Sequence, residues 1–258
     1  MFIGTGTVVN ATTVLLGSGI GALVGHRLPE RTRTVVTDGL GLVTLLIAGT
    51  SAVAVNDRSL SRAVGDSAPM LIVLGALLVG AIVGSLARLE DRLEGLGDLL
   101  QRRLTARGSS DGAAGSAGDH AARERFIQGF VTASLVFCVG PLTILGSITE
   151  GLGRGADQLL LKSALDGFAS IAFAAAFGWG VAASVVTLVV VQGGLTAVGA
   201  AVGDFLPDAH LAALTATGGL LLVGVALRLL NIKQVKVGDL LPALLVAPLL
   251  TELVVQFR

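Results

Sequence analysis

The chain has 258 residues, of which 53% are hydrophobic and only 14% are charged. A soluble domain carries about 25% charged residues, so this composition argues against a soluble enzyme. Eighteen basic and eighteen acidic residues give a formal net charge of zero, so no basic surplus points to nucleic acid. The single cysteine, Cys138, excludes a disulfide framework and a paired-cysteine metal site.

The apolar residues form long blocks that do not alternate with polar ones, which predicts membrane-spanning α-helices and not barrel strands. We expect an all-α polytopic membrane helix bundle with seven or eight spans. The last segment contains Pro242 and Pro248, so it is expected to be kinked, tilted or re-entrant. The expected spans are 3–25, 35–55, 69–87, 126–148, 159–177, 181–202, 211–230 and 237–255.

Small polar residues between the third and fourth spans predict a flexible linker at 105–125. A charged helical extension is expected before it, at 88–104, either continuing the third span or lying on the membrane surface. The predicted blocks are 1–104, with three spans, 126–203, with three more, and a C-terminal hairpin at 204–258. Because an odd number of spans inverts the second block, we expect two inverted repeats. Asp-Gly pairs at Asp38 and Asp166 support them.

Basic residues set the expected orientation, because short cytoplasmic loops are enriched in Lys and Arg. Thirteen of the eighteen Lys and Arg residues follow the odd-numbered spans, and five lie on the opposite side. The linker is therefore expected in the cytoplasm and the N-terminus outside. The C-terminus lies outside with eight spans and inside with seven.

Asp166 is the most informative polar residue, because a charged residue at the centre of a span costs about 2.5–3.5 kcal/mol on insertion scales. Lys162 lies four residues earlier and shares a helix face with it. One interpretation is an interfacial ion pair that neutralises itself. The other is an ion or proton site lined by Asp166, Lys162 and Ser163.

Two amides, Asn10 and Gln192, also lie at membrane depth. Each either bonds a neighbouring helix or lines a polar path. Pro141 interrupts the fourth span and frees a carbonyl near residues 136–137, giving either a plain kink or a broken helix that binds substrate. Thr143 follows it and could supply an oxygen ligand.

Glycines recur every four residues at Gly17, Gly21 and Gly25, and again at Gly80 and Gly84. This spacing predicts close helix packing, within one subunit or across a homodimer.

The histidines are expected outside the spans. Asp204, Asp208 and His210 are expected in a solvated outer loop.

Together these motifs resemble a family of uncharacterised bacterial multi-pass membrane proteins that includes YqgA and YdfK. The resemblance covers nearly the whole chain except the linker and implies topology, because the family carries a domain-of-unknown-function label. One departure is Gly238–Asp239, where an Asn is common. The segment SALDGFA also looks faintly like the Asp-centred helix of the lysine-exporter group. The resemblance rests on GTVVNATTVLLGSGIG, FCVGPLTILGSITEGL, KSALDGFASIAFAAAFGWGV, VVQGGLTAVGA and ATGGLLLVGVALRLLNIKQVKVGDLLPALL. The matching motif residues are Asn10, Gly140, Pro141, Lys162, Ser163, Asp166, Gln192 and Pro242.

The leading hypothesis is a secondary transporter or exporter of a small solute or ion across the cytoplasmic (inner) membrane. Asp166 would bind a cation or proton, and a passive channel or a partner-binding scaffold are the alternatives. No enzymatic activity and no cofactor are expected, and the metal question stays open. The expected partners are membrane lipids, the solute or ion and, along a glycine face, a second copy. The expected path residues are Asp166, Lys162, Ser163, Asn10, Gln192, Thr143, Pro141 and Asp38.

Overall fold

The computed structural model describes residues 2–25, 29–95, 99, 117–138, 141–202 and 207–257. Every regular element in these ranges is a helix, as the composition predicts. The elements are α1 (Thr5–Gly25), α2 (Glu30–Ala52), the 3-10 helix η1 (Val53–Asn56), α3 (Arg58–Val64), α4 (Ala68–Ala87), α6 (Ala117–Cys138), α7 (Pro141–Gly151), α8 (Asp157–Phe177), α9 (Gly180–Val202), α10 (Asp208–Leu229), the 3-10 helix η2 (Gly238–Leu240) and α11 (Ala243–Gln256).

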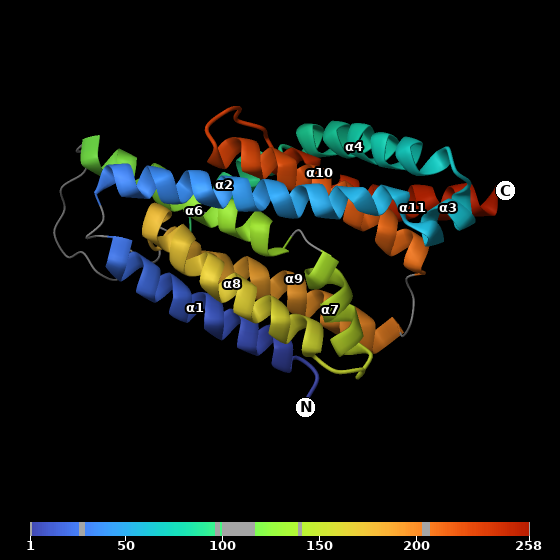
Figure 1. The fold of residues 1–258 in the computed structure, drawn as a ribbon, viewed down its shortest axis with the longest axis horizontal. Coiled ribbons are helices and arrows are strands. Elements are labelled where there is room, and N and C mark those ends of the chain that lie inside the picture. Colours follow the sequence, from blue (N-terminus) through green and yellow to red (C-terminus); the bar gives the residue numbers. More distant parts are fainter. Residues whose placement is uncertain are drawn as a thin grey trace.

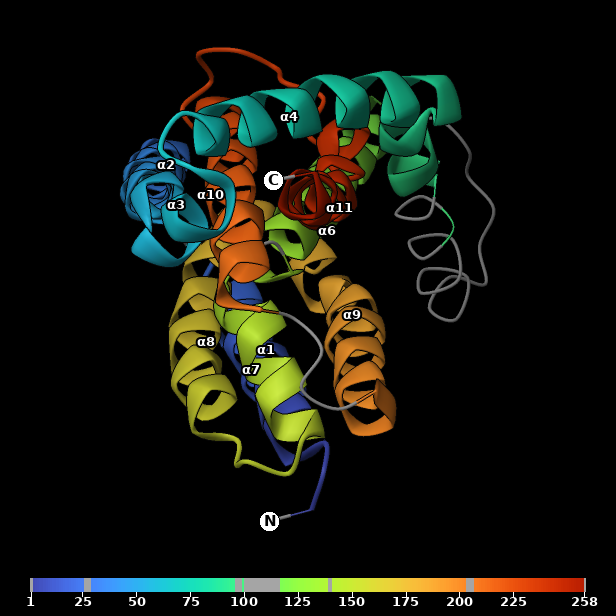
Figure 2. The same cartoon turned by 90° about the vertical axis from the view of Figure 1, so that its right-hand side faces the viewer.

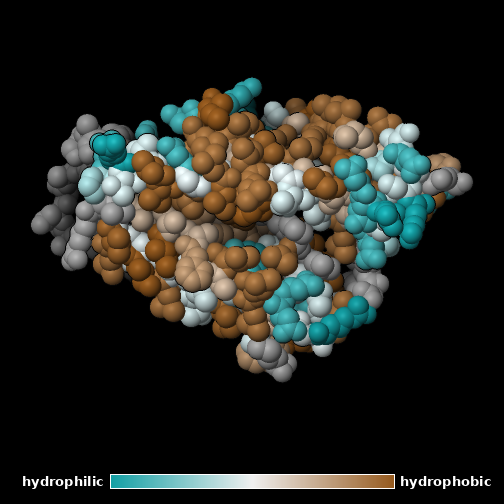
Figure 3. Space-filling model, viewed as in Figure 1, coloured by the Kyte–Doolittle hydropathy of each residue, from teal (hydrophilic) through white to brown (hydrophobic). Residues whose placement is uncertain are grey.

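Seven described helices are long and apolar enough to cross a membrane, counting Gly238–Gln256 as one of them. The pair α6 and α7 makes an eighth candidate, bent by 72° where the two helices meet. Large apolar side chains cover much of the outer surface, and hydrophilic groups gather toward the ends of the molecule (Figure 3). This distribution suits a hydrocarbon layer around the middle of the bundle, so the predicted polytopic helix bundle is confirmed.

Helices α1 and α8 run side by side in the same direction. A Cβ at Gly6 would meet Leu159, one at Gly17 would meet Gly167, and one at Gly25 would meet Ala175. Spans joined end to end alternate in direction. After α1, α2 and α4, therefore, α8 can be parallel to α1 only if α6 and α7 together cross once.

The broken pair α6–α7 also follows α9 over most of its length. A Cβ at Gly180, where α9 begins, would lie 2.0 Å from the carbonyl oxygen of Phe126, and one at Gly199 would lie 2.7 Å from that of Ile148. α9 and the pair α6–α7 therefore run parallel to each other, and α6–α7 forms one broken membrane crossing. With eight crossings the two chain ends lie on the same side. We call the end of the bundle at Thr5 the terminal side and the end at Gly25 the linker side.

The helices pair across the expected blocks. α1 packs on α8, α2 on α10 and α4 on α11, while α6 and α7 pack on α9. In Figures 1 and 2 the helices α1, α8 and α9 form one part of the molecule, and α2, α4, α10 and α11 form the other. Each helix of the first three-span block thus packs mainly on a helix from a later block. Inverted repeats remain a prediction.

The glycine faces allow two of these pairs to approach closely. A Cβ at Gly21 would lie 2.1 Å from the carbonyl oxygen of Ile171 on α8, and one at Gly84 would lie 1.9 Å from that of Asp239. Nothing lies within 4 Å of the corresponding position at Gly19. The prediction of close helix packing is confirmed, and these faces are occupied within the chain.

Two element boundaries differ from expectation. α6 begins at Ala117, so residues 117–125 of the expected flexible linker are helical, and the remainder of the linker lies outside the described residues. Arg88 adopts a left-handed conformation with a φ of 51° and ends α4. Residues 89–95 therefore form a separate helix, which excludes a straight continuation of the third span. Residues 96–98 and 100–104 of the expected extension lie outside the described range.

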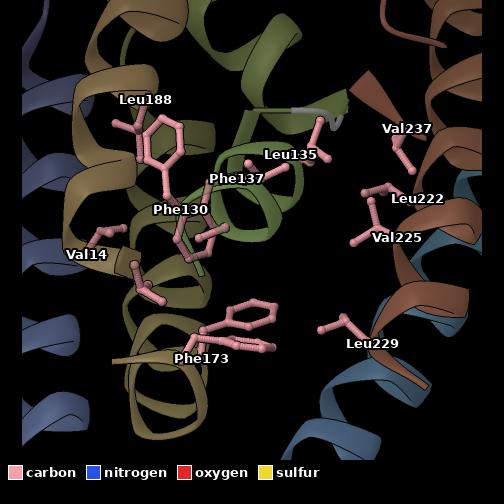
Figure 4. Close-up of a cluster of buried hydrophobic side chains, with 14 of the residues drawn as sticks. Val14, Phe130, Leu135, Phe137, Phe173, Leu188, Leu222, Val225, Leu229 and Val237 are labelled. Carbon is pink, nitrogen blue, oxygen red and sulfur yellow. The ribbon is translucent and has the colours of Figure 1, made fainter. Parts of the chain in front are cut away.

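The apolar core joins the two parts of the molecule. Phe137 of α6 packs against Phe173 of α8, and Phe130 of α6 with Leu222 and Val225 of α10 belong to the same buried cluster (Figure 4). Because α6 supplies large rings to this core, the point where α6 breaks lies next to buried groups of α8.

Candidate functional site

A buried polar cluster lies between α1 and α8. Asp166 accepts hydrogen bonds at Oδ2 from the Lys162 ammonium and, at 2.9 Å, from Nδ2 of Asn10. All three residues are buried, and Asn10 is fully so. A lysine one helical turn before an aspartate neutralises its charge, and the amide from the neighbouring helix adds a donor. The cluster therefore joins two spans through a charged pair away from water.

Hydroxyls beside the cluster bond backbone carbonyls. Ser163 donates to the carbonyl of Leu159 at 2.6 Å, as serines do inside membrane helices. Thr13 lies within hydrogen-bonding distance of two carbonyls, that of Ser163 at 2.9 Å and that of Asn10 at 3.0 Å. Of these contacts, the one from Thr13 to the carbonyl of Ser163 joins α1 to α8, three residues before Asp166. Ser163 is thus placed as expected, but its hydroxyl is engaged with the backbone.

The break in the fourth span lies where Pro141 begins α7. A proline cannot donate a backbone hydrogen bond, so carbonyls in the preceding turn need another donor. Thr143, which is fully buried, donates to the carbonyl of Phe137 at 2.9 Å. This is one of the two carbonyls that the sequence predicts to be freed. Thr143 therefore caps the end of α6, and its oxygen is already used.

The broken end of α6 adjoins the charged cluster through an aromatic ring. Nζ of Lys162 lies 6.0 Å from the ring centroid of Phe137, within the range of a cation–π interaction. That ring in turn packs edge-on against Phe173, with centroids 6.0 Å apart (Figure 4). Movement of α6 at its break would consequently act directly on the lysine that neutralises Asp166.

Two expected path residues do not join this cluster. Gln192 is fully buried on α9, and neither its Nε2 nor its Oε1 has a hydrogen-bond partner among the described residues. Asp38 is exposed on α2. The two Asp-Gly pairs therefore differ in position, because Asp166 lies in a buried site and Asp38 lies on the surface.

A second buried carboxylate, which the sequence did not single out, lies at the terminal side. Glu150 ends α7 and is 3% exposed; its Oε1 accepts a hydrogen bond of 2.5 Å from the backbone N–H of Gly6 in the first turn of α1. Its Oε2 is buried without a partner among the described residues. The only sequence signal was an acidic residue in an otherwise apolar motif.

A third buried carboxylate, that of Glu90, lies at the linker side of the bundle. Glu90 contacts Nη1 of Arg228 on α10 at 2.5 Å and accepts from the backbone N–H of Gly238 at 2.6 Å. Asp239 in turn accepts from the backbone N–H of Glu90 at 3.0 Å. These bonds tie the short helix 89–95, which follows α4, to α10 and to the start of the last span. The Gly238–Asp239 turn, where the family departure lies, is therefore a structural junction.

His210 corrects the expectation that no histidine lies within a span. It lies in the first turn of α10, is buried, and pairs with Glu252 of α11 at 3.0 Å. It borders an open cavity of about 970 Å³ between α7, α9, α10 and α11 that is mostly apolar. Asp204 lies outside the described residues. Asp166 does not line this cavity.

No group of three or more His, Cys, Asp or Glu side chains within the described ranges is arranged to hold a metal ion. The cluster instead offers one carboxylate, one ammonium and one amide. A carboxylate held by donors that can exchange partners is suited to binding a proton or a small cation in competition with the lysine.

Comparison with known proteins places the chain in a family. Residues 5–252 match the family model described as "Protein of unknown function (DUF554)". The chain is 32% identical over 242 residues to "Uncharacterized protein YqgA" of Escherichia coli K12, covering 94% of each chain. It is 26% identical over 252 residues to "Uncharacterized membrane protein YdfK" of Bacillus subtilis 168, covering 98% of this chain and 97% of that one. No solved structure matches. The chain therefore belongs to the DUF554 family of proteins of unknown function.

Proposed function

We propose that the protein is a secondary transporter or exporter of a small solute or ion, and that Asp166 is its cation- or proton-binding group. The observation that carries the proposal is the buried hydrogen-bonded cluster of Asp166, Lys162 and Asn10 between two spans. An ionisable residue is costly within a membrane, and such residues mark ion pathways and proton relays.

The helix pair α6–α7 beside the cluster is the element that we expect to move during transport. α6–α7 is a crossing broken near its middle, and broken helices form the ion and substrate sites of many transporters. The ring of Phe137, in the last turn of α6, lies beside Lys162. A shift of α6 would change how strongly Lys162 holds Asp166 and so release or capture a cation. Gln192, whose two polar atoms are buried and have no partner within the described ranges, is a further candidate for the route.

The flux experiment uses purified protein in liposomes that contain a trapped pH-sensitive dye. A potassium gradient with valinomycin sets the membrane potential, and candidate cations and small solutes are supplied outside in turn. We expect saturable flux in the wild type and its loss in Asp166→Asn. Asp38→Asn, which changes an exposed aspartate on α2, is the matched control. Unchanged flux in Asp166→Asn would remove Asp166 from the mechanism.

The same measurement separates the alternatives. A passive channel would give conductance that does not saturate with solute concentration. A partner-binding scaffold would give no flux, and its closed cluster would act only as a tie between α1 and α8. The scaffold is favoured by one observation, which is that Thr143 and Ser163 already bond backbone carbonyls.

We also propose that the protein lies in the cytoplasmic membrane with its linker inside. The support is the excess of Lys and Arg on the linker side. Because the chain has a single cysteine, Cys138→Ser gives a cysteine-free background. A cysteine replacing Ser109 in the linker should then resist an impermeant maleimide in intact cells. A cysteine replacing Gly4, at the terminal side, should react.

A further inference from the structure

A polar seam continues from the Asp166 cluster to the terminal side. Gly6, whose N–H bonds Glu150, precedes Asn10 by four residues on α1. At 1.5 Å per residue the two positions are about 6 Å apart along the helix, one turn on the same face. Glu150 and Asp166 thus contact successive turns of one helix. Glu150 is the outer of the two, because it ends α7 at the terminal side.

The Glu150 carboxylate is incompletely satisfied. Its Oε1 accepts one backbone hydrogen bond, and its Oε2 has no partner among the described residues although the side chain is 97% buried. The hydroxyl of Thr7, next to Gly6, is also buried and has no partner in the described part of the chain. A buried carboxylate with a single donor, and one oxygen without any, is costly, so a bound proton or cation would stabilise it.

We infer that Glu150 is a second proton-binding group, which loads protons at the terminal side of the α1–α8 seam and passes them toward Asp166. This inference rests on the proposed transport function. A protonated carboxyl needs only one acceptor, and the unpartnered hydroxyl oxygen of Thr7 lies on the same turn of α1. Proton transfer leaves Glu150 as a carboxylate that again accepts from Gly6.

A metal cation fits this place less well than a proton. Among the described residues, the buried oxygens without a partner on α7 and the helices packed against it include those of Glu150, Thr7, Ser147, Gln158 and Thr196. Glu150 is the one carboxylate among them, and the others are neutral hydroxyl or amide oxygens. Calcium and magnesium sites normally use several carboxylate or carbonyl oxygens, calcium taking 6–8 ligands, so a single carboxylate favours the proton.

The elements packed against α7 carry few ionisable residues. Neither α1 nor α9 contains an ionisable residue. The other elements packed against α7 are α8 and α10. Their ionisable residues are Asp157, Lys162 and Asp166 on α8 and Asp208, His210 and Arg228 on α10, and Arg154 lies in the loop after α7.

Carbon-13 NMR on the full chain in lipid nanodiscs tests the inference without a known substrate. The sequence contains six glutamates, so labelling their side-chain carboxyl carbons gives few resonances. Glu150→Gln identifies the resonance of interest by its loss, and thermal stability of the variant reports that it folds. We expect the chemical shift of this resonance to change with pH and to stay the same when choline chloride is exchanged for NaCl. The pH dependence of the chemical shift should differ between Asp166→Asn and the wild type.

Three results would overturn the inference: a Glu150 resonance that is constant with pH, one that responds to NaCl and not to pH, or one that titrates identically in Asp166→Asn. In liposomes Glu150→Gln should lose proton flux, while Asp157→Asn, an exposed acid on the adjacent helix, should keep it. Absence of any wild-type flux would reject the transport proposal alone, since the NMR titration still decides whether Glu150 binds a proton.

Discussion

Removing Lys162 alone should destabilise the protein more than removing both members of its ion pair. In Lys162→Met the carboxylate of Asp166 keeps the hydrogen bond from Asn10 but loses the ammonium that neutralises it. The side chains of the pair are 6% and 11% exposed, so water cannot replace the lost partner. Breaking a buried pair by removing one partner costs about 3–5 kcal/mol.

The double variant Lys162→Met with Asp166→Asn has no charge to bury. Replacing a buried ion pair by neutral residues is often neutral or stabilising, so the double variant should recover most of the lost stability. Because acid neutralises a carboxylate, the destabilisation of Lys162→Met should also shrink as the pH falls. Asp38→Asn, on the surface of α2, should change stability by no more than about 0.5 kcal/mol.

Equilibrium unfolding in mixed micelles, read by tryptophan fluorescence at several pH values, measures the four stabilities of this double-mutant cycle. The chain has one tryptophan, Trp179, which simplifies the signal. We expect the two single variants together to lose much more unfolding free energy than the double variant loses, and this difference is the coupling energy of the pair. Additive single changes, or a Lys162→Met variant as stable as the wild type at every pH, would refute a buried charged pair.

Four further variants test helix packing and buried hydrogen bonds. Gly21→Ala should cost about 1–3 kcal/mol by overpacking the α1–α8 contact, whereas Gly19→Ala, with open space at its Cβ, should be neutral or stabilising, as thermal denaturation would measure. Thr143→Val should cost about 1–3 kcal/mol because it leaves the buried carbonyl of Phe137 without its donor, and equal stability of this variant and the wild type would argue against that bond. Glu90→Gln should loosen the helix 89–95 from α10 and from the start of the last span, giving faster proteolysis at the linker side, and an unchanged digestion rate would contradict these contacts.

The sequence predicted the spans because hydrocarbon imposes a simple rule on composition. Long apolar blocks and internal backbone hydrogen bonding allow only helices, so the number and approximate bounds of the spans followed directly. The glycine spacing on α1 and α4 predicted close packing for the same reason, since a missing Cβ has a steric consequence wherever the partner lies. Which helix would be the partner was not readable from that spacing.

The site was predicted in part. Asp166, Lys162 and Asn10 meet because an ionisable residue in a span requires partners, and these were the polar residues available at membrane depth. Glu150, Glu90 and His210 were missed because each lies at the end of a helix, where sequence alone suggests solvation. Their burial depends on which helix ends meet in space.

The boundary of α6 shows a further limit. Residues 117–125 are polar enough to suggest a linker, yet they continue the helix of the fourth span. Composition predicts where a helix can cross the membrane, whereas a helix extends beyond the membrane as long as its own hydrogen bonds continue. Asp38 shows that local sequence similarity does not predict burial. Its segment resembles that of Asp166, yet Asp38 is exposed on α2.

Measurements of charge movement test the proposal that Asp166 carries a cation or proton across the membrane. Proteoliposomes adsorbed on a solid-supported membrane are exposed to rapid jumps in pH and in the concentration of sodium, potassium or divalent cations. We predict transient currents with the wild type and with Asp38→Asn, and none with Asp166→Asn. Currents of equal size in Asp166→Asn and the wild type would contradict the claim.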